Sequence, residues 1–195
     1  MKYFGNGETI KDYLHEHRRS MLIDISSIQM NQIKKDGINK ITEINKKKYS
    51  IPAILFDTPQ KLSKGISNNN SNNIVINYST IVRGNLKTLH YKPTVYSNAI
   101  YFESLEDSIN NVATVKFEIE IEKGEIRDLD KESINRIIND RFNEKTSEFF
   151  SNIRFINKEI QSFNSSLEEL IQKSINDQID NLNDNDAILD SIDIN

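Results

Sequence analysis

The stretch that decides the fold is Val115-Lys116-Phe117-Glu118-Ile119-Glu120-Ile121-Glu122. Apolar and charged residues alternate in it without a break. This period of two is typical of a β-strand that buries one face and exposes the other to water. Such a strand belongs in an antiparallel sheet with one solvated side. We therefore predict that Phe117 is buried and Glu118 is exposed, since a slip of one residue would reverse both.

Further strand signals precede this stretch, and the predicted sheet extends from about Ile51 to Ile126. Short apolar or alternating segments occur at 53–56, 74–78, 86–91 and 95–102. Gly84-Asn85 is typical of a turn before the third segment, and Lys123-Gly124 is typical of a turn after the deciding stretch. The polar run 67–73 has nothing to bury, so we expect a flexible loop there. These segments predict an antiparallel sheet of about four to six strands.

Helical spacing precedes the predicted sheet. The apolar residues between Glu8 and about Met30 fall on one helical stripe; they are Leu14, Met21, Ile25 and Ile28. A second helix is expected over Gln29–Lys47, with a break possible at Gly37, because glycine costs about 1 kcal/mol relative to alanine inside a helix. Pro52 ends the helical run.

Helical spacing returns after Asp130, which is the expected N-cap. From Phe149 onward the apolar residues are alternately four and three positions apart, which is a heptad seam. The seam residues that we expect to form an interaction surface are Phe149, Ile153, Ile156, Ile160, Phe163 and Leu167. Asn164-Ser165-Ser166 interrupts the seam, and Ser165 with Glu168 has the spacing of a capping box. One long helix and a helical hairpin both satisfy this pattern, and the capping box favours the hairpin.

The expected fold class is therefore α+β: an antiparallel sheet with N-terminal helices and a C-terminal helical hairpin or long helix. We expect helices plus sheet in residues 1–128 and a helical hairpin or coiled-coil-like segment in 129–183. Residues 184–195 form an acidic tail. The tail is expected to fray, because negative charge at a helix C-terminus opposes the helix macrodipole.

Composition narrows the class of protein. The chain has 195 residues and no cysteine, which excludes disulfides, thiolate metal sites and cysteine nucleophiles. No apolar run approaches the roughly 20 residues that span a bilayer, and the N-terminus lacks the apolar core of a signal peptide, so we expect a cytoplasmic protein. Residues 1–65 carry twelve Lys/Arg and seven Asp/Glu, a charge of +5. Residues 66–195 carry thirteen Lys/Arg and twenty-two Asp/Glu, a charge of −9, and the two charges sum to the net −4. Opposite-signed halves suit head-to-tail contacts or an oriented partner.

No arrangement typical of a catalytic, cofactor or metal site is found in the sequence. His15 and His17 are two residues apart, whereas a zinc pair on a helix needs a spacing of four. The carboxylates Glu118, Glu120 and Glu122 share one strand face and are in principle able to ligate a divalent cation, but three carboxylates facing water explain them as well. We predict no enzyme, no cofactor and no metal.

The order of several segments resembles a known module. These segments are Lys48-Tyr49-Ser50-Ile51-Pro52, then 81–86 (IVRGNL), then Leu89-His90-Tyr91-Lys92-Pro93-Thr94, and finally a helix with 163–167 (FNSSL). They are similar to an uncharacterised N-terminal module of bacterial proteins encoded in anti-phage defence islands. There the module precedes a separate effector, often a restriction-endonuclease-like nuclease. The resemblance implies a sensor or scaffold part, and no functional residue follows from it. Its relatives carry an Arg-rich stretch after the final helix, where this chain is acidic.

Three classes of function follow from these observations. The preferred hypothesis is a non-catalytic module that binds a protein partner or forms a homo-oligomer. We expect no association with a membrane. The alternative is an accessory nucleic-acid-binding protein that uses the basic N-terminal helices, with Lys46-Lys47-Lys48 as the main cluster. A small enzyme that uses the Glu118–Glu122 face comes last.

Overall fold

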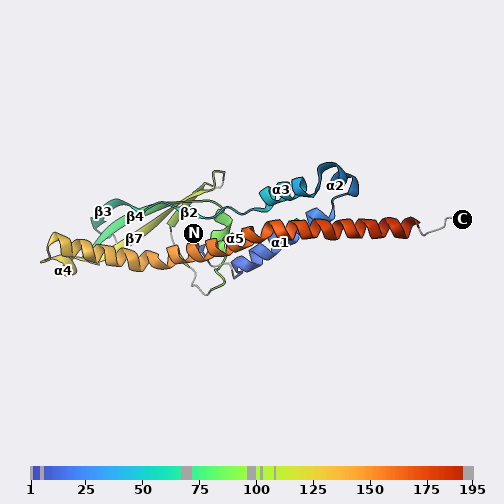
Figure 1. Cartoon of the computed structure of the whole chain (residues 1–195). Coiled ribbons are helices and arrows are strands. Elements are labelled where there is room, and N and C mark those ends of the chain that lie inside the picture. Colours follow the sequence, from blue (N-terminus) through green and yellow to red (C-terminus); the bar gives the residue numbers. More distant parts are fainter. Residues whose placement is uncertain are drawn as a thin grey trace. The chain divides into compact units, whose positions relative to one another are not determined.

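The structure is a computed structural model that describes residues 2–4, 7–66, 72–95, 100–101, 103–107 and 109–190. The chain forms two compact units. Unit 1 comprises Met1–Ile10 and Pro52–Lys158, and unit 2 comprises Lys11–Ile51 and Glu159–Asn195. The long helix α5, Lys131–Asp190, contributes to both (Figure 1). This division differs from the expected one, because the N-terminal helices share a unit with the end of α5 and not with the sheet.

Unit 1 contains the antiparallel sheet, and the α+β fold class is confirmed. The sheet has five strands in the order β2-β4-β7-β6, with β3 also paired to β4. Its strands are β2 (Leu55–Phe56), β3 (Gln60–Ile66), β4 (Asn73–Arg83), β6 (Glu103–Asp107) and β7 (Val112–Glu122). A separate two-stranded sheet joins β1 (Lys2–Tyr3) to β5 (Ile100–Tyr101).

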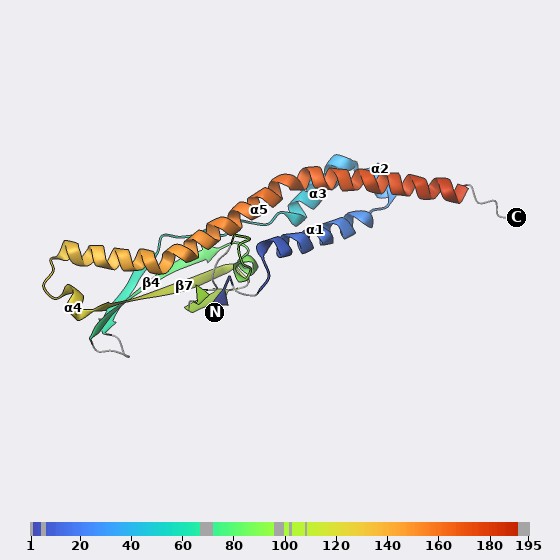
Figure 2. The same cartoon turned by 90° about the horizontal axis from the view of Figure 1, so that it is seen from below.

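The predicted facing of the deciding strand is confirmed. Phe117 is buried and Glu118 is exposed, in a β7 that pairs with β4 along its whole length. The buried, or inner, face of the sheet packs against the four-residue helix α4 (Lys123–Ile126) and the start of α5 (Figure 2). The ring of Tyr78 lies 4.6 Å from that of Phe142 in α5, between ring centroids. Aromatic and aliphatic side chains thus join one side of the sheet to one helix.

Unit 2 is built from helices. They are α1 (Ile10–Ser26), α2 (Met30–Asp36), α3 (Ile38–Tyr49) and the last part of α5. Their apolar stripes meet in one core formed by Met21, Ile25, Ile28, Ile33, Ile41, Tyr49, Leu167, Ile171 and Ile175. The expected break at Gly37 is present, and this residue has a φ of 76°, a conformation that glycine adopts without steric cost.

The preference for a helical hairpin is wrong, because α5 is continuous over 60 residues. The polar patch at 164–166 does not end the helix, because its side chains find partners that leave the helical backbone intact. Ser165 and Ser166 donate hydrogen bonds to carbonyls of the preceding turn, and the Asn164 amide bonds to the backbone of Ile51. Asp130 does act as the N-cap, since its Oδ1 accepts from the Ser133 amide at 2.7 Å.

Three smaller predictions need correction. Residues 86–90 form a 3-10 helix, η1 (Leu86–His90), in which Leu86 and Leu89 are buried three residues apart, and they do not form a strand. Lys123-Gly124 begins helix α4 and is not a simple turn. The helix continues through Asp190, so the tail is helical in its first part. Residues 67–71 of the predicted loop 67–73 lie outside the described residues, and Asn73 of that loop begins β4. Residues 191–195 also lie outside the described residues, as do 96–99 and 102 of one predicted strand.

Candidate functional site

The six seam residues lie inside the two units. Phe149, Ile153 and Ile156 are fully buried in unit 1, where Phe149 packs against the rings of Tyr3, Phe4 and Phe117. Ile160 and Leu167 are buried in unit 2, and Phe163 is partly buried against the core of that unit. A side chain without exposed surface cannot meet a partner, so the surface for a partner has to be sought elsewhere.

The outer face of the sheet, which is the face opposite α5, offers such a surface. Residues opposite one another in neighbouring strands share a face, so the strand register places the outward residues in rows. The first row is Leu55-Arg83-Val112-Asp107, and the second is Ile81-Thr114-Leu105. Within unit 1, Figures 1 and 2 show α5 along the other face of the sheet. The residues of the two rows are exposed or half-buried.

The first two rows form the apolar end of the outer face, consisting of Leu55, Ile81, Leu105 and Val112. Leu55 is 64% exposed and Leu105 is 67% exposed, although both sit in paired strands with fixed backbone. Ile81 and Val112 are half-buried between them. Single exposed leucines are common, but apolar residues gathered on one rigid face are typical of an interaction site.

An ion pair lies within the apolar end, because Arg83 stands between Leu55 and Val112 in the first row. The Arg83 guanidinium donates from Nη1 and Nη2 to the two carboxylate oxygens of Asp57, at 2.6 and 2.9 Å. This two-bond geometry lowers the pKa of Asp57 from its ordinary value. Thr80 in β4 donates its hydroxyl to the Asp57 carbonyl at 2.6 Å. Side-chain bonds therefore hold β4 to the chain segment that follows β2.

The other half of the outer face is its acidic end, consisting of Glu118, Glu120 and Glu122. All three side chains are exposed, and Asn73 of β4 donates to Glu120 at 3.1 Å. Alternate residues of a strand are about 7 Å apart, so the carboxylates form a row and not a cage. Among the described residues, no group of three or more His, Asp or Glu side chains is placed to hold a metal ion.

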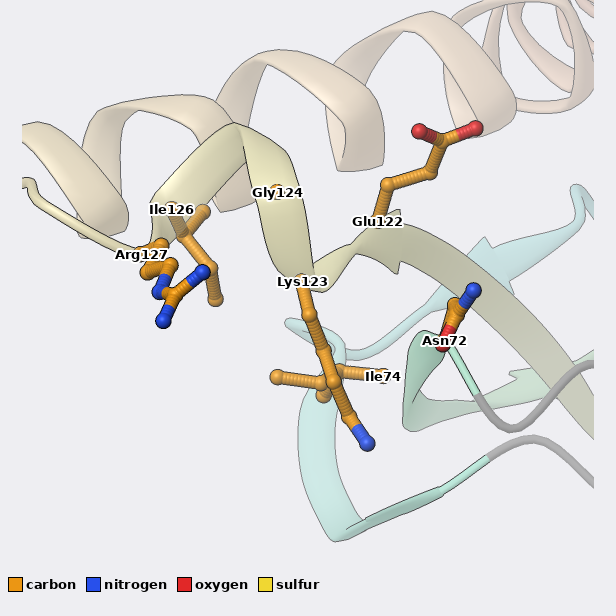
Figure 3. Close-up of a pocket in the computed structure, with 7 residues that line it drawn as sticks. All are labelled: Asn72, Ile74, Glu122, Lys123, Gly124, Ile126 and Arg127. Carbon is orange, nitrogen blue, oxygen red and sulfur yellow. The ribbon is translucent and has the colours of Figure 1, made fainter.

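A hollow of about 670 Å³ lies beside the acidic end (Figure 3). Its walls are formed by Asn72, Ile74, Glu122, Lys123, Gly124, Ile126 and Arg127. Figure 3 shows the Lys123 ammonium directed away from the Glu122 carboxylate. The hollow thus combines apolar walls with charges of both signs, and these do not converge on one point.

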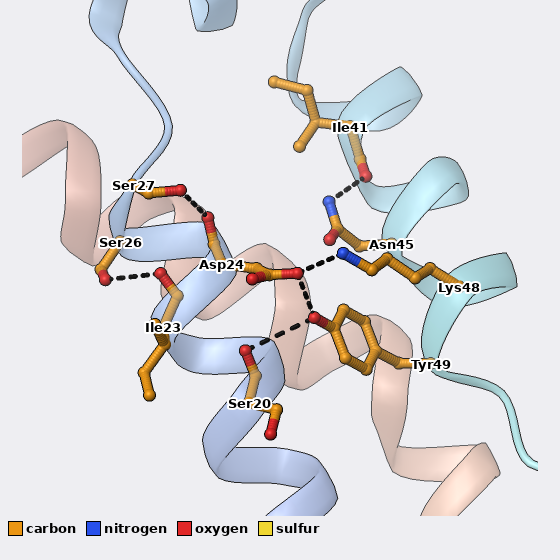
Figure 4. A network of polar contacts seen from close by, with 9 residues as sticks. All are labelled: Ser20, Ile23, Asp24, Ser26, Ser27, Ile41, Asn45, Lys48 and Tyr49. Atoms are coloured by element: carbon orange, nitrogen blue, oxygen red, sulfur yellow. Dashed lines mark hydrogen bonds and ion pairs between the residues drawn. The ribbon is translucent and has the colours of Figure 1, made fainter.

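The basic N-terminal cluster lies in unit 2, and carboxylates partly neutralise it. Lys40 pairs with Asp36, Lys46 with Glu168 in α5, and Lys48 with Asp24 in α1. Figure 4 shows Asp24 accepting from both the Lys48 ammonium and the Tyr49 hydroxyl. The two bonds lower the pKa of Asp24, and the Asp24 carboxylate raises the pKa of Lys48. These lysines therefore tie helices together within the unit.

The histidines do not assemble into a site. His15 is exposed, and His17 is half-buried with its Nε2 3.0 Å from the carbonyl oxygen of Tyr49 at the end of α3. That bond, and ring contacts with Tyr13, Tyr49 and Phe163, give His17 a packing role in unit 2. His90 belongs to unit 1.

Sequence reasoning missed the apolar end of the outer face. Leu105 lies in Glu103-Ser104-Leu105-Glu106-Asp107, where a single apolar residue gives no periodic signal, and we expected the strand at 95–102. The clue that was present is β7 itself, because a strand with one wet face predicts a sheet whose neighbours share that face.

Comparison with family models, with curated proteins and with solved structures gives no match. Within the described residues, the structure has no helix that is long and apolar enough to cross a membrane.

Proposed function

We propose that this chain is a non-catalytic protein-binding module that docks its partner on the outer face of the sheet. The observation that carries the proposal is the pair Leu55 and Leu105, which stay about two-thirds exposed on a face made rigid by strand pairing. Full burial of a leucine side chain stabilises by about 1.5–3 kcal/mol. A partner that covers both leucines gains affinity from surface that the chain itself leaves open.

The acidic end gives the proposed surface an orientation. Three carboxylates lie in line along β7, next to an end that is mostly apolar. Charge complementarity mainly sets association rate and the direction of docking, and apolar contact supplies most of the affinity. A partner with apolar and basic surface is the class that fits.

The same features weigh against nucleic-acid binding as the main function. Phosphates are repelled by the acidic end, and three of the lysines in the basic cluster are already paired with carboxylates. Retention on DNA or heparin that falls steeply with salt would favour this alternative over the proposal.

The biological setting that we propose is a sensor or scaffold subunit of a bacterial anti-phage defence system, in the cytoplasm. The resemblance of the sequence to a defence-island module supports this setting. In that case co-purification with a nuclease from the same cells would be expected.

The docking surface can be tested with a photo-crosslinking amino acid placed at position 105 in the full-length chain. The matched control carries it at position 145, where the exposed Lys145 belongs to α5 of the same unit. We expect position 105 to trap discrete protein products in living cells, and position 145 to trap few. Equal products at both positions, or none at position 105, would contradict the proposal.

A further inference from the structure

A second charged surface of the chain complements the acidic end of the outer face. Lys40, Ile44 and Lys47 follow the spacing i, i+4, i+7 along α3, so they share one side of the helix. The opposite side carries Ile41, Asn45 and Tyr49, which are buried in unit 2. We name Lys40, Ile44 and Lys47 the basic stripe.

The basic stripe is open to a partner. Ile44 is 54% exposed between the two lysines. The Lys47 side chain has no ion-pair partner among the residues that the structure describes, whereas Lys40 pairs with Asp36 at 2.6 Å and keeps 61% of its side chain exposed. From Met30 to Tyr49 the chain carries six Lys against Asp36 and Glu43, a balance of +4. The stripe is thus the outward side of a segment with strong positive charge.

The dimensions of the two surfaces agree. Glu118 and Glu122 are four residues apart on β7, which is about 13 Å at 3.3 Å per residue. Lys40 and Lys47 are seven residues apart on α3, which is about 10 Å at 1.5 Å per residue. A lysine side chain is long and flexible enough to cover the difference. Two ion pairs can therefore form at once.

We propose that the partner of the acidic end is the basic stripe of a second copy of this chain. This inference rests on the proposed function, since it names an occupant for part of the same outer face. The two surfaces are different and belong to different units, so each copy offers both of them to other copies. The contacts either continue head to tail, in rings or open chains, or close reciprocally in a two-fold dimer, in which the acidic end of each copy meets the basic stripe of the other.

The expected behaviour in solution follows from this geometry. The mean mass of the 195-residue chain measured by light scattering should rise above that of the monomer with concentration at low salt. It should return toward the monomer at high salt, because the Debye length shortens from ~30 Å at 0.01 M to ~3 Å at 1 M. A chain that stays monomeric at low salt up to high micromolar concentration would overturn the proposal.

Charge reversal identifies the two surfaces. The variants Glu118→Lys with Glu122→Lys, and Lys40→Glu with Lys47→Glu, should each weaken self-association by roughly tenfold or more, because like charges then face each other. The chain that carries all four substitutions should associate again, since the charges are exchanged and not removed. Failure of this chain to associate, while circular dichroism shows that it is folded, would sink the proposal.

A matched control separates the acidic end from net charge. The double variant Asp180→Lys with Asp184→Lys also reverses two exposed carboxylates. Like Glu118→Lys with Glu122→Lys, it moves the formal net charge from −4 to 0. The control should associate like the natural chain, and an equal loss in the control would contradict the site. If the natural chain stays monomeric while position 105 still traps a different protein, the docking function stands and this inference alone fails.

Discussion

The side-chain amide of Asn164 forms two hydrogen bonds with the backbone of Ile51. Its Nδ2 donates to the Ile51 carbonyl at 2.8 Å, and its Oδ1 accepts from the Ile51 amide at 3.0 Å. Seven residues earlier in the same helix, Asn157 makes the same two bonds to Ile54, at 2.7 and 2.8 Å. Two asparagines thus satisfy the backbone of an extended segment that has no strand partner at these two residues.

This relationship predicts the effect of Asn164→Asp. A carboxylate keeps the acceptor for the Ile51 amide but loses the donor, and it faces the Ile51 carbonyl with negative charge. A part-buried group left without its partner costs about 1–3 kcal/mol. Urea denaturation should show a loss of that size, whereas Asn176→Asp, at an exposed position of α5, should change stability by less than about 0.5 kcal/mol.

The stability lost when a glycine is replaced by alanine should depend on the backbone conformation of that glycine and on the space around it. A Cβ at Gly84 would lie 2.2 Å from the Ala53 carbonyl oxygen, at a φ of +112° that side chains rarely adopt. Gly37 has a φ of +76° with open space around it, and Gly124 has open space and an ordinary φ. Thermal unfolding should therefore show a severe loss for Gly84→Ala, a loss of about 1–3 kcal/mol for Gly37→Ala, and little loss for Gly124→Ala. A stable Gly84→Ala variant would contradict the close approach of Ala53.

The heptad seam can be tested at two adjacent residues. Ile156 is fully buried and Phe155 is 40% exposed, so Ile156→Asp places a charge in the core of unit 1 while Phe155→Asp does so mostly at its surface. We expect Ile156→Asp to lose about 4 kcal/mol or more and to unfold or aggregate. Circular dichroism should show the lost structure. A folded, smaller species by light scattering would instead indicate that the seam joins separate chains.

The stability of unit 1 should depend on alkaline pH through Tyr3. Burial raises the pKa of Tyr3 to about 12. The Tyr3 hydroxyl donates a hydrogen bond to Glu106 Oε1, with 3.1 Å between the two oxygens, and the Glu106 carboxylate also raises this pKa. Because the folded value exceeds the ordinary 10.0, this contribution is complete below pH 10 and is lost as the pH rises toward 12. The difference corresponds to roughly 2–3 kcal/mol.

Tyr3→Phe provides the control for this pH dependence. The variant should be less stable at neutral pH by about 1 kcal/mol, through the lost hydrogen bond, and its stability should fall less between pH 10 and 12. Ultraviolet titration should show one fewer late-ionising tyrosine. Loss of an early-ionising tyrosine in place of a late one would show that Tyr3 is accessible to hydroxide.

A feature of the fold could be predicted where it follows from a repeated sequence pattern. It could not be predicted where it depends on one specific partner far away in the sequence. The alternation around Phe117 repeats over a whole strand, so sequence alone was enough to predict its facing. Asn164-Ser165-Ser166 resembles a helix break, because nothing local shows that the Asn164 amide bonds to Ile51, more than a hundred residues away. The exposed Leu105 was missed for the same reason, since only the register with Thr114 places it on the outer face.

Unit 2 has a consequence for the order of events during synthesis. Its core joins α1–α3, which the ribosome makes first, to Leu167, Ile171 and Ile175, which it makes near the end. The interval from Tyr49 to Leu167 is 167 − 49 = 118 residues, and at 5–20 residues per second it takes roughly 6–24 s. Throughout that interval the apolar stripes of the nascent α1–α3 lack the rest of their core, while the second segment of unit 1, Pro52–Lys158, is translated. Unit 2 therefore completes its fold after the sheet, and its first helices are the part of the nascent chain most in need of chaperone protection.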